Sequence, residues 1–276
     1  MKRRSLSDIL MLHSWGLWVQ RMLLLSCALT LFGIGILPSS LAQEFNPEDR
    51  GLPGRRQGGG TRGGCLTQQP TLTALIPDTN LGTTLSEYPS FFWYVPENNA
   101  VAAEFVLLDA NNQELYQTIL PVTQQAGIVQ FKLPEDGTAQ PLKTGESYRW
   151  YFSLICNPLD RSTDSFTTGW IRRIEPSAEL TAALSRATAA EKPQIYLQQG
   201  IWYEGLTSLV QLHQTQPQTP GWNQQWQQLL RSIGLDQIAD QLADRPFMIQ
   251  FFSQDSSSRH LSSRHLSSRH LIVLLE

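Results

Sequence analysis

Short segments of alternating polar and apolar residues recur between Thr71 and Ile174, and they constrain the fold more than any other feature. A dense aromatic run, Phe91–Val95, ends at Pro96, and turn-forming residues separate the other segments in the same way. We expect about seven strands, over residues 71–76, 91–95, 102–108, 114–120, 127–133, 148–156 and 167–174. Strands of this length and spacing are typical of an antiparallel β-sandwich of the immunoglobulin or fibronectin type III kind, here over residues 65–174.

A tyrosine follows a turn at the start of one of these strands. Residues 142–147 turn the chain, and Tyr148 then begins the alternating pattern. In such sandwiches a tyrosine corner occupies this place, and its hydroxyl hydrogen-bonds the backbone of the preceding crossover. We expect Tyr148 to take this role, and an ordinary core tyrosine in the same fold is the alternative.

Past Glu175 the apolar residues follow a helical period, so the fold class is α+β. Helices are expected over residues 176–191, 193–199, 202–214, 222–233 and 235–242. A tetratricopeptide-like (TPR-like) pattern of aromatic, glycine, small, apolar and proline positions is matched by Tyr196, Gly200, Gly205, Leu209 and Pro217. The region 175–245 is therefore predicted to hold a single TPR-like helical hairpin, not an array.

Residues 1–42 have the order of a secretory signal peptide. Basic residues precede the apolar run Met22–Leu37, and small residues follow it at Ser40-Leu41-Ala42. The run is short for a spanning helix, which needs about 20 residues. We therefore expect a periplasmic or extracellular protein that starts at Gln43. The basic segment before the run is long, so an uncleaved membrane anchor remains the alternative.

Two segments have compositions that do not favour a packed core. Residues 43–64 are rich in glycine and arginine and are predicted to form a disordered linker, for which contact with an anionic surface is the functional alternative. Residues 246–276 form an irregular tail with three copies of Ser-Ser-Arg-His-Leu. Its histidines, His260, His265 and His270, are five residues apart, which aligns them on neither a helix nor a strand face. No metal site is expected.

Charge and cysteine content narrow the function classes. Of 21 basic and 24 acidic residues, four basic and one acidic precede position 43, so the remainder has a net charge of −6. This balance argues against nucleic acid as a partner. Two cysteines follow the signal, Cys65 and Cys156, and an even count in an exported chain suggests a disulfide. Two independent buried thiols are the alternative.

The sequence contains no phosphate-binding glycine loop, HExxH, CxxC or GxSxG motif, so no cofactor or catalytic residue is assigned. His213 lies among leucines, which favours packing. Asp160, Asp164 and Glu146 lie near strand ends, where acids are routine. The most distinctive segment is Trp202-Tyr203-Glu204, whose aromatics beside a carboxylate suggest an interaction patch for sugar or peptide. On a helix these three side chains spread over different faces, which favours attachment of the helix to the sandwich.

Several motifs in one order resemble a cyanobacterial family of unknown function, number 928 of the domain-of-unknown-function series. They are the glycine-rich segment ending at Cys65, Leu72–Pro77, Phe92–Pro96, Tyr148–Ser153 with Cys156, Gly169–Ile171, Gly200–Glu204, Leu229-Leu230 and Gly234-Leu235. The resemblance extends to about Ala243. It implies an exported protein of the cyanobacterial periplasm or envelope, and it transfers no catalytic residue because the family has no established activity.

These observations favour an exported, non-enzymatic binding or scaffold module whose partner is a protein or another envelope component. A membrane partner is expected only if the signal is uncleaved. The alternatives are a carbohydrate-acting hydrolase of the cell wall that uses Asp160, Asp164 and Glu204, and a structural subunit of a surface layer.

Overall fold

The computed structural model describes residues 53–58, 64–66, 70–216, 221–243 and 249–252, which all belong to one unit of the chain. Its strands are β1 (Thr73–Ala74), β2 (Leu81–Thr84), β3 (Ser90–Val95), β4 (Ala102–Leu108), β5 (Glu114–Leu120), β6 (Gly127–Lys132), β7 (Ser147–Ile155), β8 (Ser165–Arg173) and β9 (Ile249–Phe252). A short 3-10 helix, η1 (Arg161–Thr163), lies between β7 and β8. The helices are α2 (Ala178–Arg186), α3 (Lys192–Gln198), α4 (Trp202–Thr215), α5 (Trp222–Ser232) and α6 (Asp236–Ala243).

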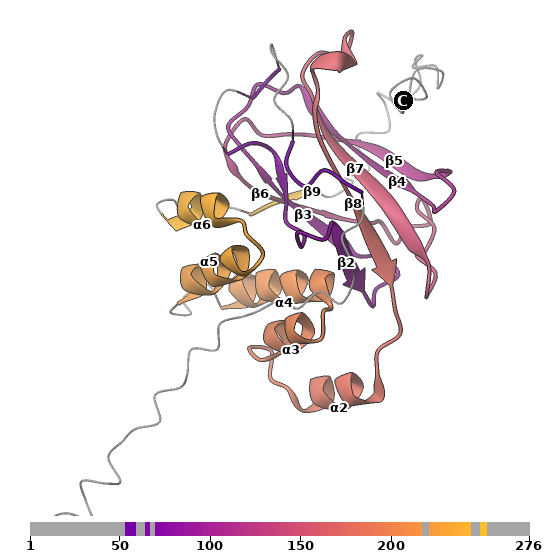
Figure 1. The fold of residues 1–276 in the computed structure, drawn as a ribbon, viewed down its shortest axis with the longest axis vertical. Coiled ribbons are helices and arrows are strands. Elements are labelled where there is room, and N and C mark those ends of the chain that lie inside the picture. Colours follow the sequence, from indigo (N-terminus) through magenta and orange to yellow (C-terminus); the bar gives the residue numbers. More distant parts are fainter. Residues whose placement is uncertain (1–52, 59–63, 67–69, 217–220, 244–248, 253–276) are drawn as a thin grey trace, which may run out of the picture. The chain divides into compact units, whose positions relative to one another are not determined.

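The strands form two sheets, as expected for a β-sandwich (Figure 1). One sheet has the order β1-β3-β6-β9, and the other has the order β2-β8-β7-β4-β5. Each of the seven expected strands is present, and the α+β class is confirmed. The sheets are not wholly antiparallel, however, because β2 pairs in parallel with β8 and β9 pairs in parallel with β6.

The core between the sheets is mainly aromatic. The Trp93 and Phe152 rings, one from each sheet, stack with centroids 4.1 Å apart, and Phe91 meets Phe105 at 4.9 Å. Along β7, even-numbered residues are buried and odd-numbered residues are half-buried up to Ser153, so the strand has one face in the core. Aromatic pairs of this kind add stabilisation beyond the area that they bury.

The prediction of a disordered linker is wrong over residues 53–58. Arg55 forms an antiparallel bridge with Thr168, and Gln57 forms one with Thr73, so the segment touches both sheets. Arg56 donates hydrogen bonds to the carbonyl oxygens of Ile233 (2.7 Å) and Gly234 (3.2 Å) at the end of helix α5. A guanidinium group there satisfies carbonyls that the helix leaves unpaired.

Four helices lie within one residue of the predicted ends, but α2 is shorter than the predicted 176–191 and ends at Arg186, because Ala187 takes an extended backbone conformation (φ −76°, ψ 140°). Helix α5 ends in a Schellman motif, with Gly234 at φ +72° and hydrogen bonds from Leu235 N to Leu230 O and from Gly234 N to Arg231 O. Helix α4 lies against strand β2 (Figure 1). Helix α3 has only seven residues because Pro193 lies in its first turn, and a TPR-like region is not confirmed.

The boundaries predicted for the sandwich and the tail need one correction. Strand β9 lies in the predicted irregular tail but pairs with β6, so it extends the four-stranded sheet. Residues 253–276, with His260, His265 and His270, lie outside the described residues, and so does the predicted signal 1–42. Within the described part, no helix is long and apolar enough to cross a membrane.

Candidate interaction surface on the five-stranded sheet

The segment Trp202-Tyr203-Glu204 is buried against the sandwich. Trp202 is 0% exposed and its Nε1 donates a hydrogen bond to Leu75 O at 2.7 Å. Tyr203 is 1% exposed, and its hydroxyl accepts a hydrogen bond from Trp150 Nε1 at 3.1 Å. The prediction of an interaction patch for sugar or peptide is wrong for these two residues, because the sandwich already covers both rings.

Strand β2 lets the tyrosine come close because it carries a glycine. A Cβ atom at Gly82 would lie 2.7 Å from Tyr203 Cε2, closer than such atoms approach. The Tyr203 ring also meets Phe91 edge to face at 5.4 Å. Burial raises the pKa of the Tyr203 hydroxyl, so this group stays neutral in the core. Helix α4 therefore completes the core of the sandwich instead of presenting its aromatics to a partner.

Glu204 lies next to these rings, at the end of β2. Its Oε1 accepts hydrogen bonds from Thr84 Oγ1 (2.7 Å), Leu85 N (3.0 Å) and Ser86 N (3.0 Å). Its Oε2 is closed off from solvent and has no hydrogen-bond partner among the described residues. Burial raises the pKa of Glu204, against the lowering effect of its hydrogen bonds. The carboxyl group thus attaches helix α4 to the loop after β2.

We predict that Glu204→Gln removes part of the pH dependence of stability. A raised folded-state pKa means that the contribution of Glu204 is full below its ordinary value of 4.5 and is lost as pH rises through the folded-state value. The neutral glutamine has no such loss, so the variant should gain stability relative to wild type as pH rises. Urea denaturation from acid to neutral pH measures this difference.

The exposed Glu97→Gln is the matched control, because its side chain lies in solvent. A Glu204→Gln difference that stays constant with pH would contradict the assignment, and so would an equal pH trend in the control variant.

The other acids proposed for catalysis lie at the opposite end of the five-stranded sheet. Asp164 precedes β8, whereas Glu204 contacts Thr84, which pairs with Arg173 at the far end of β8. Nine strand residues separate the two ends by about 26 Å. The structure therefore does not bring Asp160 and Asp164 together with Glu204.

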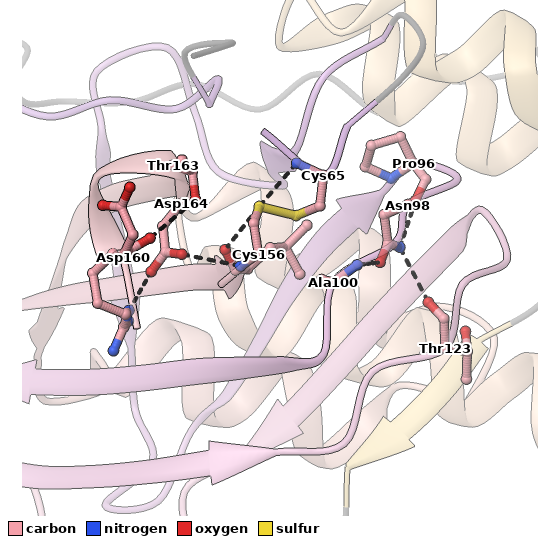
Figure 2. The surroundings of a disulfide bond; sticks show 11 residues. Cys65, Pro96, Asn98, Ala100, Thr123, Cys156, Asp160, Thr163 and Asp164 are labelled. Carbon is pink, nitrogen blue, oxygen red and sulfur yellow. Dashed lines mark hydrogen bonds and ion pairs between the residues drawn. A yellow bond between two sulfur atoms is a disulfide. The ribbon is translucent and has the colours of Figure 1, made fainter. Parts of the chain in front are cut away.

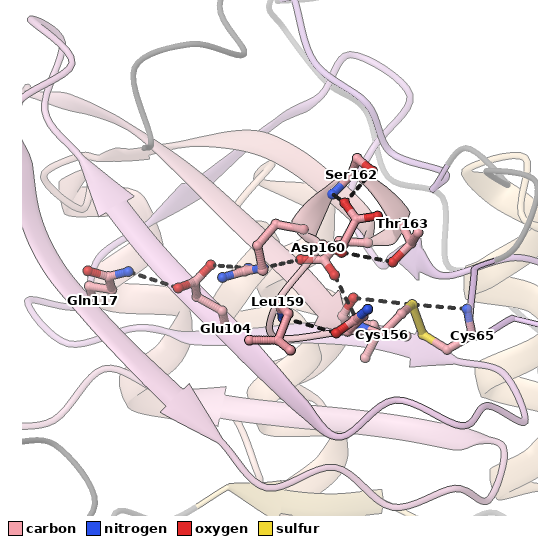
Figure 3. A network of polar contacts seen from close by, with 12 residues as sticks. Cys65, Glu104, Gln117, Cys156, Leu159, Asp160, Ser162 and Thr163 are labelled. Atoms are coloured by element: carbon pink, nitrogen blue, oxygen red, sulfur yellow. Dashed lines mark hydrogen bonds and ion pairs between the residues drawn. A yellow bond between two sulfur atoms is a disulfide. The ribbon is translucent and has the colours of Figure 1, made fainter. Parts of the chain in front are cut away.

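Asp160 and Asp164 instead order the loop between β7 and β8. Asp160 accepts a hydrogen bond from Ser162 N and caps η1. Asp164 pairs with Arg161, whose Nη2 also lies 2.7 Å from Oε2 of the buried Glu104. Gln117 donates to the second oxygen of Glu104 at 2.8 Å, so a continuous polar network ties this loop to β4 and β5 (Figure 3). Buried charges are stable only when paired in this way.

The predicted disulfide between Cys65 and Cys156 is present, and it lies beside this loop (Figure 2). The two Cα atoms are 5.1 Å apart. Cys156 N donates to Asp164 Oδ1, and Cys65 O accepts from Asn99 N. The bond therefore fixes Cys65, in the described segment 64–66, to the end of β7.

Tyr148 lies at the opposite end of β7. Its hydroxyl accepts a hydrogen bond from Lys143 N at 2.8 Å and donates to Glu146 Oε2 at 3.1 Å. Lys143 belongs to the preceding crossover. The hydrogen bond from its backbone N–H to the Tyr148 hydroxyl is therefore the bond that the tyrosine-corner pattern predicts. Burial raises the pKa of Tyr148, so the hydroxyl stays protonated and can donate to Glu146.

The solvent side of the five-stranded sheet carries a surface that was not predicted from the sequence. We call it the outer face, and its central residues are Glu104, Val106, Leu108, Ile119, Arg149, Tyr151, Phe166 and Trp170. Register aligns them in rows: Val106 lies opposite Tyr151, and Leu108 lies opposite Arg149, which lies opposite Trp170. Val106 and Leu108 are 5% and 9% exposed although they point away from the core.

Aromatic rings and arginines contact one another on this face. Arg149 Cζ lies 4.9 Å from the centroid of the Tyr151 ring and 6.0 Å from that of Trp170. Arg55, from the segment 53–58, has its Cζ 4.9 Å from the Phe166 centroid. The three aromatic residues are half-buried, so each ring still has a solvent-facing part. At these distances the guanidinium groups make cation–π contacts with the rings.

Among the described residues, no group of three or more histidine, cysteine, aspartate or glutamate side chains is placed to hold a metal ion. His213 stacks on Trp222 with centroids 4.3 Å apart, and burial lowers the pKa of the imidazole. Stacking of this kind gives the histidine a packing role between helices α4 and α5, as its leucine neighbours predict.

Comparison with known proteins adds a family match. The family model described as Domain of Unknown Function (DUF928) matches residues 57–243. No curated protein matches the chain. Among solved structures, the chain is similar to the solution structure of the fn3 domain of human collagen alpha-1(XX) chain, at 13% identity and a TM-score of 0.25. That match covers 48% of this chain and 93% of the collagen domain.

Proposed function

We propose that this chain, which belongs to the DUF928 family, is an exported, non-enzymatic binding or scaffold module whose partner docks on the outer face. The observation that carries this proposal is the set of half-buried aromatic and arginine side chains on a sheet face that points away from the core. Tyrosine, tryptophan and arginine are the residues most enriched where protein interfaces have their binding energy.

The surroundings of the outer face also support docking. Ile119, in the row of Glu104, is 55% exposed, and Leu159, on the β7–β8 loop, is 96% exposed. The Glu104–Arg161 pair and the disulfide hold this loop in place, so a partner would meet an ordered edge. Preorganised side chains lose less conformational entropy when they bind.

The remaining parts of the proposal come from the sequence. A signal peptide at 1–42 would deliver the chain to the periplasm or envelope of a cyanobacterium, and the disulfide suits such an oxidising compartment. The TPR-like helical pair, α3 and α4, is proposed to serve as internal support and not as a second binding groove. On α4, Trp202 and Tyr203 are already buried, and Tyr196 on α3 is half-buried.

Photo-crosslinking tests the proposed docking site. A photoreactive phenylalanine analogue in place of Tyr151 should crosslink the chain to an envelope component in intact cells. The same analogue at Gln225, an exposed position on helix α5, is the matched control and should give little product. The ring-for-ring exchange at position 151 leaves the core untouched, so folding should be preserved.

Equal crosslinking from both positions, or none from position 151, would contradict docking on the outer face. Fractionation of the same cells tests export separately, because an exported chain should leave the cytoplasmic fraction and begin at Gln43.

A further inference from the structure

The outer face holds a charged group that the chain itself does not neutralise. Arg149 has no hydrogen-bond or ion-pair partner in the part of the chain that the structure describes, and its Nε is closed off from solvent. Arg55 likewise has only backbone hydrogen bonds and the Phe166 ring. Of the acids near this face, Glu104 and Asp164 are both engaged by Arg161. The exposed Glu114 lies opposite Leu108, so the β4 strand separates it from Arg149. Around the three aromatic rings, the charges that no acid of the described residues pairs with are thus those of Arg149 and Arg55.

We propose that the outer face recognises an acidic polypeptide segment and that Arg149 pairs with one of its carboxylates; this inference rests on the proposed function. A guanidinium group presents several N–H donors in one plane, which fits a carboxylate with two parallel hydrogen bonds. Arg149 Cζ lies near both the Tyr151 and the Trp170 rings, so these contacts restrict its side chain before the partner arrives. The net negative charge of the chain repels an acidic partner and slows its association. The arginines of the outer face therefore also define where such a partner can approach.

A polypeptide fits this surface better than a polysaccharide. Binding of a sugar to aromatic side chains needs a free ring face, but here guanidinium groups lie over Tyr151, Trp170 and Phe166. The neighbouring exposed side chains, Ile119 and Leu159, are aliphatic and suit apolar side chains of a peptide. A segment that combines acidic with apolar residues therefore complements both parts of the surface.

Selection from a random peptide display library on the immobilised full chain, with its disulfide intact, tests this inference. The selected peptides should contain more aspartate and glutamate than the input library. A synthetic peptide from the selection should bind Arg149→Glu about tenfold more weakly or worse. Arg149→Lys should give an intermediate loss, because it keeps the charge but not the planar donor pair. Gln225→Glu, which adds one negative charge at an exposed position away from the sheet, should bind as wild type does.

The other outcomes separate the inference from the proposed function. Selected peptides that lack acidic residues but lose binding when Tyr151 is replaced by serine would overturn the acidic partner and leave docking on the outer face intact. Peptides that bind Arg149→Glu and Tyr151→Ser as tightly as wild type would contradict both the acidic partner and docking on the outer face. Polygalacturonate is a polysaccharide rich in carboxylates, and if it binds more tightly than the selected peptide, the assignment to a polypeptide is overturned. Failure of the library to enrich any binder would overturn it as well. Circular dichroism and urea denaturation of each variant establish that it is folded.

Discussion

Replacing Trp202 by alanine is expected to lower the free energy of unfolding by about 3–5 kcal/mol. The indole is 0% exposed, and its Nε1 donates to Leu75 O at 2.7 Å. Truncation removes apolar contacts, leaves a cavity between helix α4 and the sheets, and leaves the Leu75 carbonyl without that donor. Because small domains are stable by only about 5–15 kcal/mol, this change removes a large part of the stability.

Urea denaturation followed by far-ultraviolet circular dichroism measures the loss. Trp202→Phe separates its two causes, since phenylalanine fills most of the space without a donor and should lose about 1–2 kcal/mol. The exposed Gln225→Ala should change stability by less than about 0.5 kcal/mol. A loss of that small size in Trp202→Ala would show that helix α4 does not complete the core.

The strands that could be predicted from sequence are those whose side chains alternate. Strand β7 is the clearest, with Tyr148, Trp150 and Phe152 on the core side. Strand β2 (LGTT) has no such alternation, and it exists because its backbone pairs with β8 and because Gly82 admits Tyr203. Strand β9 has apolar residues but lies beyond the helices, and a partner so distant in sequence leaves no local signal.

The linker prediction failed over residues 53–58 because composition reports only how much apolar surface a segment can bury. This segment is held by its backbone, through the bridges of Arg55 and Gln57, and by the hydrogen bonds of Arg56 to helix α5. Neither depends on apolar side chains. A glycine- and arginine-rich composition therefore does not exclude order when a sheet edge and a helix end offer unpaired backbone groups.

The candidate site shows a similar limit. Trp202, Tyr203 and Glu204 stand out because aromatics adjoin a carboxylate, but adjacent helix residues do not share a face. Their environment depends on where helix α4 meets the sandwich. The outer face has only a weak signal: Tyr151 lies out of phase with Tyr148, Trp150 and Phe152. Alternation alone cannot decide which aromatic phase points to the core when both phases contain rings.

Removing the disulfide should have the second large effect on stability. Cys65 and Cys156 are 91 residues apart, and a loop of that length stabilises a protein by about 4–5 kcal/mol in the chain-entropy model, as an upper figure. The double variant Cys65→Ala, Cys156→Ala is preferable to either single variant, which would keep one free thiol. Urea denaturation of the double variant should show a midpoint well below that of the oxidised wild type.

Reduction supplies the internal control for this experiment. A reducing agent should lower the wild-type midpoint towards that of the double variant, and it should leave the double variant unchanged. Because the bond acts mainly by restricting the unfolded chain, its loss should also steepen the dependence of unfolding free energy on urea, as more surface becomes exposed. A lower midpoint with an unchanged slope would instead place the effect in the folded state, where the bond holds Cys65 beside Asn99 and the loop that carries Arg161.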